Sequence, residues 1–179
     1  MNSKTSKPKK RLSRLVFTDV IMKAYEGALN EYRSKSKNAD GSPMTQLDVA
    51  NILNLTDDKI ISKIERFIQG MDDRTFTVFV LATDNHARYK LIQRKTKARN
   101  PRLILEPPTP AVIAQYRNNI EGLSSAMLSE ALGLHSGTVG KYESLTADAA
   151  NRRSPSAHTW TLMLLVTNQH PNYKIVARD

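Results

Sequence analysis

The chain has 179 residues, no cysteine and a formal net charge of +10, and 40% of its residues are hydrophobic. This composition is typical of one ordinary globular domain or two small ones, and it excludes disulfides and thiolate metal sites. No apolar run approaches the length of a membrane span, and the first residues lack the apolar core of a signal peptide. We therefore expect a cytoplasmic protein with no membrane partner.

The positive charge is concentrated in two segments. Residues 1–14 contain six lysines and arginines and no acid, and residues 88–102 contain seven and no acid. Cationic segments of this kind bind phosphate backbones without sequence preference and in a salt-dependent way. We expect a basic tail that contacts phosphates and a basic connector that helps it; the alternative is a solubilising tail and a solvated linker. The tail residues that we expect to contact phosphates are Lys9, Lys10 and Arg11.

The N-terminal part of the chain predicts an unstructured tail followed by a helix. Residues 1–12 are rich in lysine and serine, a composition typical of segments that do not fold alone. From Val16 to Tyr32 apolar residues recur at helical spacing, which predicts one helix. The polar loop 34–43, with Asn, Asp and Gly, ends it.

Residues 45–68 predict two short helices joined by a turn. Thr45 is expected to cap the first helix, and Asn54 occupies the turn because asparagine tolerates the left-handed conformation. The second helix is expected to begin at Asp57. An acid there suits the helix dipole but repels phosphate.

The segments that follow each predicted unit are short and partly β-branched. Residues 89–93, 173–177 and 103–105 read as short strands or as last helical turns, and we favour strands in a small sheet. The prolines of residues 107–110 then break the chain.

Residues 123–144 predict a second helix–turn–helix. Ser124 or Ser125 is expected to cap its first helix, and Gly133 ends that helix without a Cβ penalty. Ser136 is expected to cap the second helix, in which Val139 and Tyr142 face inward. Thr138, Gly140 and Lys141 would then face outward.

At these residues the chain resembles the Cro/repressor-type helix-turn-helix family. The resemblance extends from Thr109 to near the C-terminus, and it implies a helix that enters the major groove of duplex DNA. Ser125 departs from the family pattern, which has a phosphate-contacting glutamine there. The matching residues are Leu123-Ser124, Leu128, Glu130-Ala131-Leu132-Gly133-Leu134, Thr138-Val139-Gly140-Lys141-Tyr142-Glu143 and the loop Arg152 to Ser156.

The chain also contains an internal repeat. Residues 74–92 align with residues 158–176 without a gap, and seven positions are identical. We therefore expect two copies of one domain that pack together or pair with another chain. The predicted fold is mainly α, with two tandem Cro/repressor-like helix-turn-helix domains and a small sheet or hairpin from the connector and C-terminus. The predicted divisions are a tail at 1–14, a first domain at 15–92, a connector at 93–108 and a second domain at 109–179.

These features together predict sequence-specific binding of double-stranded DNA by a transcriptional regulator, more often a repressor in this family. The second copy is expected to be the stronger reader, because the residues that open its recognition helix are small and neutral. In addition to the tail, the expected DNA-binding residues are Ser125, Ser136, Gly137, Thr138, Lys141, Arg152 and Arg153 in the second copy and Gln46, Lys59, Ser62 and Lys63 in the first.

The sequence is also compatible with two other functions. The chain would otherwise be a protein-interaction or assembly factor on this scaffold, or a non-specific nucleic-acid-binding protein. A homodimer would present four motifs. His86 and His170 occupy equivalent repeat positions, but the sequence places no second ligand at metal spacing, so we expect helix-terminal histidines rather than a metal site. We expect no cofactor, no small-molecule substrate and no enzymatic activity.

Overall fold

The computed structural model describes residues 10–11, 19–57, 59–67, 69–96, 99, 101–145 and 153–179. Within these residues the fold is mainly helical, as predicted, with a small antiparallel sheet. No helix of the described part is long and apolar enough to cross a membrane. The elements are β1 (Lys10–Arg11), α1 (Ala28–Lys35), α2 (Gln46–Ile52), α3 (Lys59–Glu65), α4 (Asp73–Ala82), β2 (Tyr89–Gln93), α5 (Pro110–Asn118), β3 (Ile120–Glu121), α6 (Ser125–Ala131), α7 (Thr138–Glu143), α8 (Ala157–Val166) and β4 (Tyr173–Ala177).

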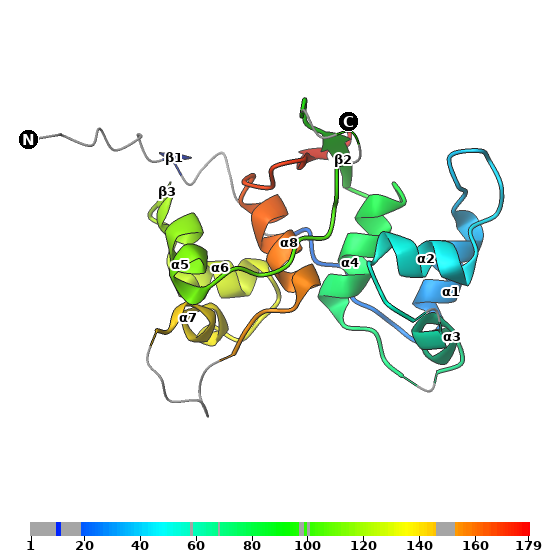
Figure 1. The fold of residues 1–179 in the computed structure, drawn as a ribbon, viewed down its shortest axis with the longest axis horizontal. Coiled ribbons are helices and arrows are strands. Elements are labelled where there is room, and N and C mark those ends of the chain that lie inside the picture. The colour runs from blue at the N-terminus through cyan, green and yellow to red at the C-terminus, as the bar shows by residue number, and fades with distance from the viewer. Residues whose placement is uncertain are drawn as a thin grey trace, which may run out of the picture.

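The order of four helices and a strand in α1 to β2 recurs in α5 to β4. We call residues 19–94 the first half and residues 101–179 the second half. β2 and β4 pair antiparallel and form what we call the ribbon, with Tyr89 opposite Ala177 and Gln93 opposite Tyr173. Because the repeat aligns Tyr89 with Tyr173 and Gln93 with Ala177, this register is symmetric. The two halves are therefore related by an approximate two-fold axis through the ribbon (Figure 1).

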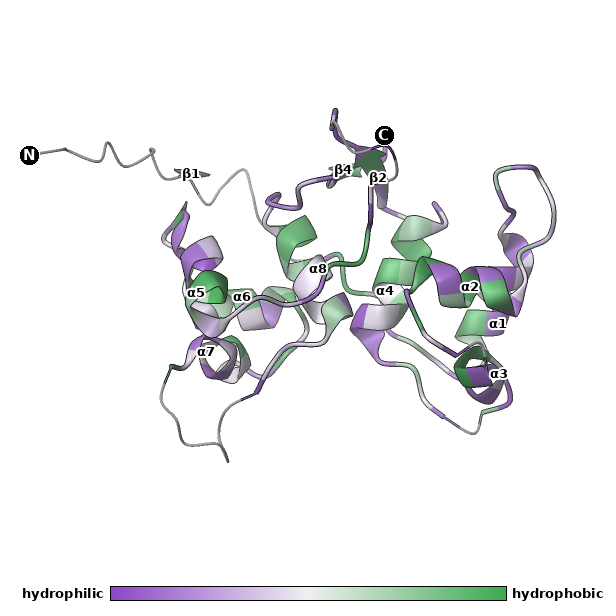
Figure 2. Cartoon of the chain, in the orientation of Figure 1, coloured by the Kyte–Doolittle hydropathy of each residue, from purple (hydrophilic) through white to green (hydrophobic). Residues whose placement is uncertain are grey.

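Helices α4 and α8 form the centre of the molecule and pack against each other. Asp72 caps α4 and Ser156 caps α8, each by accepting backbone N–H groups of the first turn. Residues 75–81 of α4 and 159–166 of α8 are buried without interruption. A helix that is apolar on all sides must be covered on all sides. Figure 2 accordingly shows α8 and the C-terminal part of α4 mostly in hydrophobic colours.

An extended segment precedes the first helix of each half and lies along the central helix. The backbone N–H of Met22 donates to Thr77 Oγ1 at 2.8 Å, and that of Leu105 donates to Thr161 Oγ1 at 2.9 Å. The predicted helix over 16–32 is therefore wrong for residues 19–27, since α1 begins only at Ala28. Val20 is buried, and Ile21, Met22 and Ala24 are half-buried against neighbouring elements although the segment is extended, so their helical spacing did not indicate a helix.

The two repeated histidines anchor these extended segments. His86 Nε2 contacts the Val20 carbonyl and His170 Nε2 contacts the Leu103 carbonyl, both at 2.8 Å. The Nδ1 atom of each ring accepts two backbone N–H groups at the start of the following strand. Nδ1 is therefore unprotonated and Nε2–H is the donor. Both rings are saturated by backbone contacts, and no group of three potential metal ligands occurs among the described residues.

Protonation of these histidines would destabilise the fold. Burial lowers the pKa of His86 and of His170 below the ordinary value of 6.5, and nearby Arg178, Arg88 and Arg94 act in the same direction, while Asp19 and the carbonyls that accept from Nε2–H oppose it. As the pH falls below 6.5, the unfolded chain therefore binds more protons than the folded chain. The stabilisation is complete above about pH 7 and is lost as the pH falls below 6.5, by at most about 1.4 kcal/mol per pH unit for each histidine.

Urea unfolding between pH 7.5 and about 5 measures this dependence. His86→Gln and His170→Gln should each remove part of the slope, and the double variant should remove more than either alone. An unchanged slope in all three variants would contradict the assignment.

Two arginines join the halves reciprocally at the ends of the central helices. Arg94 Nη2 donates to the Asn168 carbonyl at 3.0 Å, and Arg178 Nη2 donates to the Asp84 carbonyl at 2.6 Å. Asn168 and Asp84 are the left-handed residues that follow α8 and α4, with φ of 53° and 58°. Each half thus supplies the cation that neutralises the C-terminal end of the other half's central helix.

Two of the three expected strands are present, and the third is not. Residues 89–93 and 173–177 are strands, as favoured, but residues 103–105 are not, because their backbone instead contacts His170 and Thr161. Lys10 and Arg11, expected to lack structure, pair in parallel with Ile120 and Glu121 of β3. The rest of the tail lies outside the described residues.

Candidate nucleic-acid interface

The pairs α2–α3 and α6–α7 are built from equivalent local signals. Thr45 caps α2 with a capping box to Asp48, and Ser124 caps α6 by accepting the Met127 N–H. Asn54 and Gly133 follow α2 and α6 with φ of 51° and 62°, as their residue types predicted. Helix α2 contacts α3, and α6 contacts α7. The turn residues therefore set the direction in which α3 and α7 leave.

Gly133 is also a contact between the halves. A Cβ there would lie 3.4 Å from Cγ2 of Ile21 in the first half's extended segment. A side chain would therefore crowd Ile21 in addition to straining the backbone. On the other side of the two-fold axis, His158 Nε2 lies 2.8 Å from the Leu53 carbonyl at the end of α2.

Helix α7 exposes most of the residues predicted to face DNA. Ser136, Gly137 and Lys141 are exposed and Thr138 is half-buried, whereas Val139 and Tyr142 are buried. The N-cap is Gly137, so the expected cap at Ser136 is wrong. The Thr138 N–H donates to the His135 carbonyl and the Val139 N–H donates to Ser129 Oγ, so the start of α7 presents small side chains to the surface.

A mostly buried ion pair holds each exposed helix to the first helix of its half. Arg117 Nε lies 2.6 Å from Glu143 Oε1, joining α5 to α7, and Arg33 Nε lies 2.5 Å from Glu65 Oε1, joining α1 to α3. Each arginine also donates through Nη1 to a backbone carbonyl at 3.0 Å, that of Leu123 or Met44. These forks orient α7 and α3 with the same geometry.

The predicted residues of the first half are only partly available. Lys59 and Lys63 are exposed and Ser62 is half-buried. Gln46 donates to Glu65 Oε2 at 2.6 Å, so its amide supports the ion pair rather than lying free for phosphate. Asp57 precedes α3 instead of opening it, and its carboxylate accepts the Lys59 N–H at 2.9 Å.

One exposed cation near α3 was missed from the sequence. Arg66 immediately follows the helix and is exposed. The sequence could have identified Arg66, because Lys59, Lys63 and Arg66 recur at spacings of four and three and so share one side of a helix. Together they give the first half a basic stripe, which we call the α3 stripe.

The other predicted contact residues differ in how much of them the structure describes. Ser125 is half-buried, with Oγ 3.7 Å from where a Cβ on Gly140 would lie. Arg153 is exposed, and Arg152 and Lys9 lie outside the described residues. For Lys10 and Arg11 the structure describes the backbone pairing alone.

Fewer cations of the basic connector are free to contact phosphate than its charge suggests. Arg94 is bound to the second half through Asn168. Arg88, just before the ribbon, is paired with Asp19 at 2.7 Å. Among the described cations that follow Arg94, Lys95, Arg99 and Arg102 are exposed.

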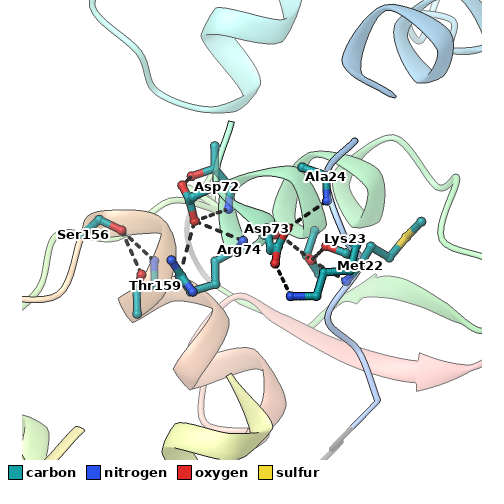
Figure 3. A network of polar contacts seen from close by, with 10 residues as sticks. Met22, Lys23, Ala24, Asp72, Asp73, Arg74, Ser156 and Thr159 are labelled. Atoms are coloured by element: carbon teal, nitrogen blue, oxygen red, sulfur yellow. Dashed lines mark hydrogen bonds and ion pairs between the residues drawn. The ribbon is translucent and has the colours of Figure 1, made fainter. Parts of the chain in front are cut away.

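The two exposed helices share one side of the molecule. In Figure 1, α3 and α7 lie at opposite ends of the lower side, and the ribbon lies on the upper side. The N-terminal ends of α4 and α8 lie between them, where Figure 3 shows Arg74 and Asp72 beside Ser156 and Thr159. Arg74 pairs with Asp72 at 3.3 Å. This side is therefore a polar surface bounded by two equivalent helices.

No family model, curated protein or solved structure matches the chain.

Proposed function

We propose that this protein is a sequence-specific binder of double-stranded DNA that acts as a transcriptional regulator, of repressor type, with α7 and α3 as its recognition helices. The observation that carries the proposal is the presence of two exposed helices, related by the two-fold axis, on one side of a single chain. In DNA-binding proteins that use paired helix-turn-helix units, such helices enter successive major grooves about 34–36 Å apart. One chain would then present the two recognition helices that a dimer of single helix-turn-helix units presents.

The two helices are suited to different tasks. Helix α7 offers Ser136, Gly137 and Thr138, whose small and neutral side chains can approach base edges closely, and Lys141 is long enough to reach guanine or phosphate. The α3 stripe suits phosphate contacts, whereas Asp57, just before α3, repels phosphate at that end of the helix. The operator should therefore contain two different half-sites, of which the one bound by α7 is better defined.

The connector should contribute little to the same complex. It leaves from the end of β2, and Figure 1 shows the ribbon on the opposite side of the molecule from α3 and α7. A straight duplex that contacts both helices would not reach Lys95. This geometry replaces the expectation that the connector holds the same DNA.

Selection of bound duplexes from a random pool, followed by titration of the best duplex, tests the proposal. Lys141→Ala and Thr138→Ala should each weaken binding to the selected duplex by about tenfold, since one good base or phosphate contact contributes about 1–3 kcal/mol. Lys95→Ala removes the same charge on the other side and should change the affinity by less than about twofold.

The alternatives give different results in the same experiment. A non-specific binder would enrich no motif, would show a steep salt dependence, and would lose most of its binding when residues 1–14 are removed. A protein-interaction factor would retain its duplex affinity, however weak, in both the Lys141 and the Thr138 variants. Either pattern would overturn specific reading by α7.

A further inference from the structure

A cavity lies in the first half between the start of α1 and the end of α3. Its volume is about 360 Å³, and the buried side chains of Leu29 and Phe76 contribute to its lining. Helices α1 and α3 are in contact and lie side by side in Figure 1. This size is within the range of sites that enclose a small ligand.

Two aromatic side chains at this cavity are open to solvent. Tyr25 is 53% exposed and Phe67 is 59% exposed, and both line it. Phe67 has a φ of 61°, a conformation that is costly for a bulky residue. Its ring lies near Gly27, where a Cβ would be 3.8 Å from Cε1 of the ring. The chain thus places a large apolar ring at the surface at some energetic cost.

The charge of the cavity is negative. Its described lining includes the carboxylates of Glu26 and Glu65 and no lysine, arginine or histidine. Glu65 is already bound by Arg33 and Gln46, so its charge is matched. Glu26 also lines the cavity and is exposed to solvent. The Tyr25 hydroxyl donates to Glu31, and this hydrogen bond holds the Tyr25 ring in place.

The cavity is not part of the repeated scaffold. The positions of Tyr25 and Glu26 correspond to Thr109 and Pro110 in the second half, and that of Phe67 corresponds to Leu145. The repeated elements that hold the fold, such as the arginine–glutamate pairs, are kept in both halves. The residues that give this cavity its rings and its charge are therefore special to the first half.

We propose that this cavity is a binding site for a small organic cation, an ammonium group that carries an apolar substituent. The rings of Tyr25 and Phe67 stabilise the cation through their negative faces, and Glu26 supplies the opposite charge. The apolar substituent covers Leu29 and Phe76. The cavity borders α3, but this proposal does not rest on the proposed DNA-binding function.

Calorimetric titration of the full-length protein with benzyltrimethylammonium, benzyl alcohol and benzoate tests the proposal. These probes share a benzyl or phenyl group and differ in charge. The cation should bind saturably with one site per chain, and at least about tenfold more tightly than the alcohol or the anion. Equal affinity for the three probes, or no saturable binding of the cation up to about 10 mM, would overturn it.

Matched variants locate the site. Phe67→Ala and Glu26→Gln should each weaken binding of the cation by about fivefold to tenfold, and Phe67→Tyr should retain it. Leu145→Ala makes the corresponding change in the second half and should leave the affinity unchanged. Glu26 is on the surface, so its variant remains informative even if Phe67→Ala unfolds the chain. Unchanged affinity in Glu26→Gln, or equal losses in Leu145→Ala and Phe67→Ala, would refute the location.

Discussion

The Arg117→Ala variant is expected to lose about 3–5 kcal/mol of unfolding free energy, because it leaves a mostly buried carboxylate without its cation. The side chains of Arg117 and Glu143 are only 19% and 10% exposed. The same substitution removes the donor to the Leu123 carbonyl at the junction between α5 and α6. Urea unfolding followed by circular dichroism measures the loss.

Two further variants separate charge from packing at this site. Arg33→Ala removes the equivalent pair with Glu65 and should cost a similar amount, since the geometry is repeated. The double variant Arg117→Met with Glu143→Leu leaves no buried charge and should be more stable than Arg117→Ala alone. A double variant that is less stable than the single one would show that the fork, rather than its charge balance, supports α7.

The second large effect is expected at Trp160, in the centre of α8. Trp160→Ala should cost about 3–5 kcal/mol, because a large side chain that is 3% exposed would leave a cavity. Its ring meets the Tyr116 ring edge-on, with centroids 5.3 Å apart. The loss of this contact adds to the cost. Thermal and urea unfolding measure the change.

The internal repeat supplies the control for this prediction. The first half has Phe76 at the equivalent position, in the same edge-on contact with Tyr32 at 5.4 Å. Trp160→Phe should therefore cost less than about 1.5 kcal/mol, because the surrounding scaffold already accommodates phenylalanine in the other half. Equal losses for phenylalanine and alanine would mean that the indole, and not an aromatic ring in general, is required at this site.

Much of the local structure was predictable from residue types. Asn54 and Gly133 occupy left-handed turns, and Thr45 and Ser124 cap their helices, as expected. The gapless repeat predicted two units that pack together or pair with another chain, and the short β-branched segments at residues 89–93 and 173–177 are strands that pair with each other. The caps and turns depend on one residue and its near neighbours, so a sequence pattern carries them.

The candidate interface was predictable in outline but not in detail. The exposure of Ser136, Gly137 and Lys141 follows from helical periodicity around the buried Val139 and Tyr142. Periodicity gave no indication that Gln46 would be bound to Glu65, because these residues meet only when α2 packs on α3. In the same way, the positive charge of residues 88–102 gave no indication that Arg94 would be bound by the second half.

The sequence by itself determined the helix caps, the left-handed turn residues, the repeat and the positions of most charges, because each depends on chemistry within a few residues. Only the tertiary structure decided that residues 19–27 are extended, that Arg94 and Arg178 bind across the two-fold axis, and that α3 and α7 share one side. The physical reason is that a buried donor or apolar side chain must be satisfied, and its partner can lie in the other half, beyond the reach of any local pattern.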